Sequence, residues 1–118
     1  MLKVHAKKLD SVEVFCLEGK IVNGYTEALR SVVESASGAG DIILDLSNVT
    51  VVDAHGLGVL LQLRERTLAN GVHFELMNVN ERLLRVFKIT RLNTVFEINS
   101  GARFLPKPTY APQLLVAA

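Results

Sequence analysis

The sequence lacks the residues from which disulfides and the common zinc motifs are built. Cys16 is the single cysteine among 118 residues, so no disulfide can form within the chain and no pair of cysteines can hold a metal. The three histidines, His5, His55 and His73, are far apart in the sequence and form no HExxH motif. We therefore predict no metal site and no cofactor.

An excess of charge of one sign is also absent. The 13 Lys and Arg residues and the 12 Asp and Glu residues leave a net charge of +1. Nucleic-acid binding is not expected, because domains that grip phosphates usually carry a larger basic excess. No stretch approaches the run of about 18 apolar residues that crosses a bilayer. Residues 1–8 lack the apolar core of a signal peptide. We expect a soluble, cytoplasmic protein with no direct membrane insertion.

The length and composition fit one globular domain. Apolar residues make up 49% of the chain and charged residues 21%, which is typical of soluble domains and excludes a disordered or fibrous protein. Pro106, Pro108 and Pro112 fall close together near the end and prevent a continuous helix there. We expect a domain over residues 1–100, followed by a Pro-containing tail over residues 101–118.

Hydrophobic patterns predict strands and helices in alternation. Strands are predicted over residues 2–6, 12–17, 41–46, 73–79 and 95–98, and helices over residues 25–36, from about 57 to 70, and over residues 80–89. Residues 41–46 form an apolar run without alternation, which is typical of a central strand covered on both faces. The order predicts a single α/β domain whose mixed sheet has four or five strands and whose helices number three or four.

The sequence also predicts where two helices begin or end and which side chains of one of them face inward. Asn80 is expected to cap the helix that ends at Ile89, and Gly71 is expected to follow the end of the preceding helix. On that preceding helix, the side chains expected to face inward are Leu57, Leu60, Leu61 and Leu68.

The segment from Asp45 to Gly58 carries the strongest indication of a binding site. We expect residues 47–55 to form a loop at the carboxyl edge of the sheet, where ligands and partners usually dock. The helix that follows opens with Gly56-Leu57-Gly58. Its first N–H groups and its dipole favour an anion, and its glycines would let a partner's backbone approach closely.

Residues 41–98 resemble a STAS domain, the family that includes bacterial anti-sigma factor antagonists. The matching segments are Leu44-Asp45-Leu46, Val51-Val52-Asp53, Gly56-Leu57-Gly58 and the later run from Leu84 to Phe96. The resemblance implies a binding module rather than an enzyme. In antagonists of this type, the domain docks on an anti-sigma factor that is also an ATP-dependent serine kinase, and thereby frees the sigma factor.

The sequence departs from the family at the position of its switch. The family motif reads Asp-Ser-Ser-Gly-Leu-Gly, and the resemblance implies that phosphorylation of its second serine turns binding off. Here Ala54 and His55 stand at the two serine positions, and Val22 or Asn23 stands at a position that is usually acidic. His55 would face the positive end of the helix dipole, so we expect a neutral imidazole at the docking surface. Ser47 and Thr50 lie in the same predicted loop and are candidates for a replacement phosphorylation site.

We therefore predict an antagonist-like protein–protein module that binds a kinase-type anti-sigma factor and is not switched by serine phosphorylation at the usual site. The expected partner-binding residues are Thr50, Asp53, Ala54, His55, Gly56, Leu57 and Gly58. Asp53 would contact the partner, cap the helix, or do both. No GxSxG motif supports a hydrolase.

Two alternatives stay open at this point. The same segment would also suit a STAS module that binds a small anion or nucleotide, or an accessory subunit of a membrane transport system. A homodimer is compatible with either alternative.

Arg82, Arg85 and Lys88 recur every three residues, which favours the solvated face of an amphipathic helix over a partner-facing basic stripe.

Overall fold

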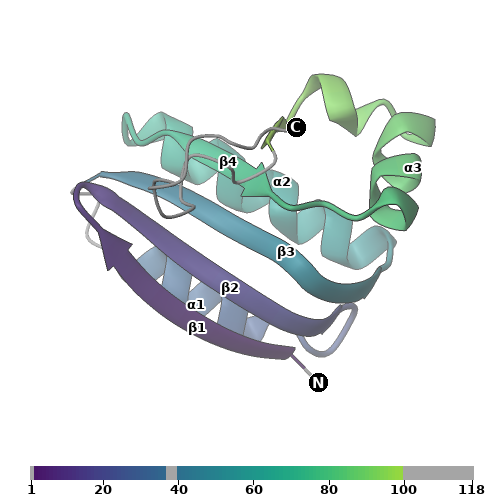
Figure 1. Ribbon diagram of the computed structural model, residues 1–118, viewed down its shortest axis with the longest axis horizontal. Helices are drawn as coiled ribbons and strands as arrows, with labels where there is room; N and C mark the ends of the chain where they lie inside the picture. The colour runs from purple at the N-terminus through teal and green to yellow at the C-terminus, as the bar shows by residue number, and fades with distance from the viewer. Residues whose placement is uncertain (1, 37–39, 100–118) are drawn as a thin grey trace, which may run out of the picture.

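A hairpin of two long strands opens the fold and lies at one edge of a five-stranded sheet (Figure 1). The computed structural model describes residues 2–36 and 40–99. The elements, in chain order, are β1 (Leu2–Leu9), β2 (Val12–Ile21), α1 (Glu27–Ser35), β3 (Asp41–Val52), α2 (Ala54–Ala69), β4 (Phe74–Met77), α3 (Glu81–Ile89), the 3-10 turn η1 (Leu92–Thr94) and β5 (Glu97–Asn99).

The sheet is mixed, and its strands lie in the order in which they occur in the sequence. β1 and β2 pair antiparallel, whereas β2, β3, β4 and β5 pair parallel. Each parallel step is made through a segment that contains a helix, as parallel neighbours require. The prediction of one α/β domain with a mixed sheet of four or five strands and three or four helices is confirmed.

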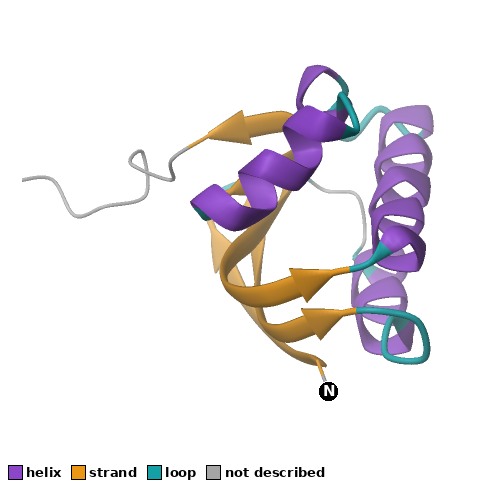
Figure 2. Ribbon diagram, turned by 90° about the vertical axis from the view of Figure 1, so that its right-hand side faces the viewer, coloured by secondary structure: helices purple, strands orange, loops and turns teal. Residues whose placement is uncertain are grey.

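The helices pack against one face of the sheet through a single apolar cluster (Figure 2). On β3, Ile42 and Leu44 point into this cluster, while Ile43 between them packs with Val14 and Met77 on the opposite face. These β3 side chains are buried on both faces, which confirms the expectation of a covered central strand. The same packing fixes the carboxyl end of β3, from which α2 begins.

The prediction of a loop over residues 47–55 is wrong, because β3 continues to Val52. β2 extends to Ile21 and keeps pairing with β3, up to the pair Ile21 and Val52. Two register shifts on β2, between Cys16 and Glu18 and between Gly19 and Lys20, absorb the irregular stretch. The run Val49-Thr50-Val51-Val52 is rich in β-branched residues, which favour the strand. Thr50 therefore lies on a strand.

The prediction that Leu68 of α2 faces inward is also wrong, because this residue is 43% exposed. The buried positions of this helix are Gly56, Val59, Leu60, Leu63 and Thr67. Leu60 of the expected face is among them, and Leu57 and Leu61, also expected to face inward, are partly buried against the main apolar cluster. The end of the helix is as predicted: Asn70 is its C-cap, and Gly71 adopts a φ of 74°.

Residues 101–118, the predicted Pro-containing tail, lie outside the described residues. Within residues 2–36 and 40–99, none of the helices has the length and apolar character that would let it cross a membrane.

Candidate partner-binding site

Asp53 holds the start of α2 in place. It follows β3 directly, adopts an extended conformation and is the N-cap of the helix. One carboxylate oxygen accepts a hydrogen bond from the backbone N–H of Gly56 at 2.7 Å. The other accepts from the backbone N–H of Asn23 at 3.0 Å. The predicted capping role is confirmed, and the second bond also fixes the loop between β2 and α1 beside the helix start.

The two hydrogen bonds stabilise the charged form of the Asp53 side chain. The N–H of Asn23 and, next, the N–H of Gly56 hold the pKa of this carboxyl below its ordinary value. Asp53 is therefore an anion at neutral pH. A fixed negative charge lies at the point where a partner would meet the first turn of α2.

We expect Asp53→Asn to remove an acid-sensitive part of the stability. The folded-state pKa lies below the unfolded-state one, so the wild-type contribution is complete above the unfolded value of about 3.9 and is lost as the pH falls through the folded value. Asparagine keeps one acceptor but cannot ionise. Urea unfolding should show a clear difference between the two proteins at about pH 6 and a smaller one at about pH 3. A difference that is constant over this range would contradict the prediction.

The two glycines of the motif have different surroundings. A Cβ on Gly56 would lie 2.0 Å from the backbone oxygen of Ile21 and 2.9 Å from its carbonyl carbon. The backbone of Ile21 thus occupies the space beside Gly56, and this space is not available to a partner. A Cβ on Gly58 would meet nothing within 4 Å. Of the two, only Gly58 offers an open approach to a partner.

The remaining residues of the predicted site divide by exposure. Ala54 and His55 are exposed in the first turn of α2, beside the cap. Leu57 is partly buried and packs against the main apolar cluster. His55 is therefore an exposed polar side chain in the first turn of the helix.

Thr50 lies apart from this group. Its hydroxyl donates to the backbone oxygen of Gly19 at 3.3 Å, across from β3 to β2. It lines an open hollow of about 660 Å³ together with Ser47 and Arg82. The described lining of this hollow is drawn from β2, β3 and the start of α3, with no residue of α2. Thr50 thus lines a hollow apart from the first turn of α2, and its part in partner binding stays a prediction.

Sequence reasoning missed the loop over residues 22–26 as part of the site. The backbone N–H of Asn23 reaches Asp53, and Gly24 turns the chain with a φ of 91°. Two residues beyond Asn23, Tyr25 leaves 53% of its surface exposed. An aromatic residue directly after an Asn-Gly turn was the available signal, since large exposed aromatics are common at interfaces.

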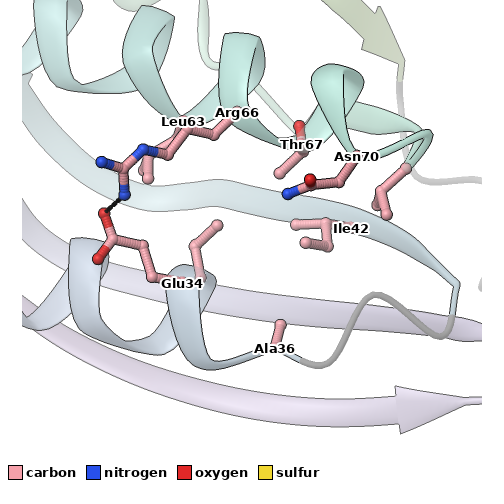
Figure 3. A pocket seen from close by; sticks show the side chains of 9 residues that line it. Glu34, Ala36, Ile42, Leu63, Arg66, Thr67 and Asn70 are labelled. Atoms are coloured by element: carbon pink, nitrogen blue, oxygen red, sulfur yellow. Dashed lines mark hydrogen bonds and ion pairs between the residues drawn. The ribbon is translucent and has the colours of Figure 1, made fainter.

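A second hollow, of about 420 Å³, lies between α1 and the far end of α2 (Figure 3). Arg66 of α2 and Glu34 of α1 form an ion pair at its mouth, and Ile42 and Leu63 contribute apolar walls. Asn70 also lines it, at the opposite end of the 16-residue helix from Asp53. At 1.5 Å per residue this separation is about 26 Å. The hollow is not part of the candidate site.

The expected solvated face of α3 is confirmed as exposed. Arg82, Arg85 and Lys88 are exposed, while Leu83 and Phe87 of the same helix are buried. The helix begins as predicted, because the Asn80 side chain accepts a hydrogen bond from the backbone N–H of Leu83 at 2.9 Å. Whether these cations contact a partner stays a prediction.

The sequence matches a known protein family over most of its length. The model of the STAS domain matches residues 3–103. The chain belongs to the STAS domain family. The anti-sigma-B factor antagonist of Staphylococcus aureus is 31% identical over 64 residues, which are 54% of this chain and 59% of that protein. The match thus spans less than two thirds of the relative's length.

Solved structures show the same fold. A candidate anti-sigma factor antagonist from Thermotoga maritima superposes with a TM-score of 0.75 at 24% identity, over 82% of this chain and 86% of that one. SpoIIAA of Bacillus, solved in its phosphorylated form, gives a TM-score of 0.66 at 19% identity, over 86% of this chain and 96% of that one. The chain is a STAS domain whose sequence is similar to anti-sigma-B factor antagonists and whose fold matches that of solved antagonist structures.

Proposed function

We propose that this STAS domain docks on a kinase-type anti-sigma factor in the cytoplasm and thereby releases a sigma factor. The proposed surface, called here the α2-start surface, consists of Tyr25, Asp53, Ala54, His55 and Gly58. The observation that carries the proposal is the double hydrogen bond of Asp53, which holds the β2–α1 loop and the start of α2 in one arrangement. A surface fixed in this way loses little entropy when a partner binds.

The chemistry at position 55 supports a module without the usual serine switch. We propose that His55 occupies the position of the phosphorylated serine of the family. An imidazole offers no hydroxyl to a serine kinase, and the preceding residue, Ala54, offers none either. The module would then bind its partner in the presence and in the absence of ATP.

The experiment that tests the function is an affinity capture from a lysate of the source cell, with and without ATP. We expect one ATP-binding, kinase-type anti-sigma factor to be recovered in both conditions, with the intact mass of the bait unchanged. Recovery of a membrane transport complex instead would support the accessory-subunit alternative. ATP-dependent loss of the partner, with added phosphate on the bait, would contradict the proposal of a module without a switch.

Tyr25 provides a matched test of the surface. Tyr25→Ala should weaken binding of the recovered partner by about 10-fold or more, because buried aromatic anchors dominate many interfaces. Ile89→Ala is the control, since Ile89 is 76% exposed at the end of α3, outside the α2-start surface. Titration calorimetry should show an unchanged affinity for the control. Equal losses in both variants would place the interface elsewhere.

A further inference from the structure

Three side chains with metal-binding atoms meet at the β4–β5 edge of the sheet. His73 comes directly before β4, and Glu75 lies two residues on, so both side chains are on the same face. Glu97 is the register partner of Glu75 on the parallel strand β5. The fold thus brings together residues that are far apart in the sequence, at the opposite side of β3 from the hairpin of β1 and β2.

Both carboxylates lie close to the same ring nitrogen of His73. The Nε2 atom of His73 lies 2.9 Å from Oε1 of Glu75 and 3.4 Å from Oε1 of Glu97. The three ligand atoms all lie within 4.8 Å of one another. Bonds of about 2.0 to 2.2 Å around a tetrahedral Zn²⁺ would separate its ligand atoms by about 3.3 to 3.6 Å. The two separations from the His73 nitrogen, 2.9 and 3.4 Å, are close to this spacing.

The donor set suits a cation better than it suits a hydrogen bond. One Nε2 atom carries at most one hydrogen, so it can serve only one of the two carboxylates with a full hydrogen bond. The lone pairs of the imidazole nitrogen and of both carboxylate oxygens can instead bind one divalent ion together. Imidazole with carboxylates is a donor set for first-row transition metals, whereas Mg²⁺ and Ca²⁺ prefer oxygen alone.

The surroundings of Glu75 are those expected of a carboxylate that binds a metal. It is only 3% exposed, and carboxylates are rarely buried to this degree unless they are paired or bind a metal. Asn99, two residues after Glu97 on β5, donates a hydrogen bond from Nδ2 to Oε2 of Glu75. Such a bond orients a ligating carboxylate and is typical around metal sites. Glu97 and His73 are more exposed, so an ion and a water ligand can reach the site.

We infer that His73, Glu75 and Glu97 form a binding site for a first-row divalent cation such as Zn²⁺, independent of the α2-start surface. The three protein ligands leave a coordination position for water, as three-ligand zinc sites do. The ion would also link β4 to β5, a strand of three residues that pairs with β4 at three positions. Bound metal should therefore stabilise this edge of the sheet.

Equilibrium dialysis of the full chain against Zn²⁺, with elemental analysis of the retained metal, tests the site. We expect one Zn²⁺ per chain in the wild-type protein, together with a rise in melting temperature, because a ligand that binds the folded state stabilises it. Glu97→Gln and His73→Gln should each weaken binding by about 10-fold or more. The Glu97 side chain is 60% exposed, so its substitution should leave the fold intact, which circular dichroism will verify.

Control variants separate this site from other zinc-binding side chains. Cys16 on β2 and His5 on β1 are register partners and are the next candidates for adventitious binding. Cys16→Ser and His5→Gln should retain one Zn²⁺ with unchanged affinity. The inference is overturned by a wild-type protein that retains no Zn²⁺, or by folded Glu97→Gln and His73→Gln variants that bind it as tightly as wild type. Neither result would bear on binding of an anti-sigma factor.

Discussion

Gly56→Ala should destabilise the domain by about 3 kcal/mol, because the added methyl group has no room. Its Cβ would lie 2.0 Å from the backbone oxygen of Ile21, an atom held in β2 by pairing with β3. A backbone atom of a paired strand cannot move as the end of a flexible side chain can. The start of α2 would have to shift away from β2, which would also strain the two hydrogen bonds of Asp53.

Gly58→Ala is the matched control for this prediction. It adds the same methyl group two residues later in the same helix, where a Cβ meets nothing within 4 Å. Alanine is a better helix former than glycine by about 0.5 to 1 kcal/mol, so stability should stay equal or rise. Urea unfolding gives both values. If the two variants unfold at the same denaturant concentration, the close contact at Gly56 does not govern the stability of the domain.

The replacement of His55 by serine should create a phosphorylation site where the wild-type chain has none. His55 is exposed in the first turn of α2, directly after Asp53 and Ala54. A serine at this position would present a hydroxyl in the first turn of the helix, whose positive dipole end favours a phosphate. With ATP and the kinase-type partner, His55→Ser should gain one phosphate per chain, as intact mass spectrometry would show.

The phosphorylated His55→Ser protein should also lose its partner. A phosphate adds a charge of about −1.5 to −2 next to the Asp53 carboxylate at the docking surface. His55→Ala is the control, since it removes the imidazole without adding a hydroxyl, and it should stay unmodified. Phosphate on the wild-type chain at Ser47 or Thr50 would contradict the proposal and would move the switch to the hollow beside α3.

The sequence predicted the order of the elements because each carries a local signal. The apolar run over residues 41–46 indicated the central strand, and the Asn80 cap and Gly71 marked helix ends that the structure confirms. The length of β3 was missed because a strand continues only while a neighbour pairs with it. β2 pairs with β3 as far as Ile21, and no local sequence pattern shows how far that pairing extends.

Some features of the candidate site could likewise be predicted from the local sequence, and others could not. The Asp53-to-Gly58 segment was recognisable because an acid before a glycine-opened helix is a capping pattern that nearby residues define. The contribution of Asn23 was not recognisable, since it is a backbone N–H brought to Asp53 from the end of β2. The exposure of Leu68 likewise followed from which stripe of α2 meets the sheet rather than from periodicity alone.

The sequence by itself determined the fold class, the elements and the capped start of α2, since these depend on hydrophobic period and on hydrogen bonds between near neighbours. Only the tertiary structure decided that Gly56 must lack a side chain, because the backbone of Ile21 fills that space. It also decided that His73 meets Glu97, because the parallel register of β4 and β5 sets Glu97 opposite Glu75. Contacts between distant strands depend on register, which is fixed by packing across the whole sheet.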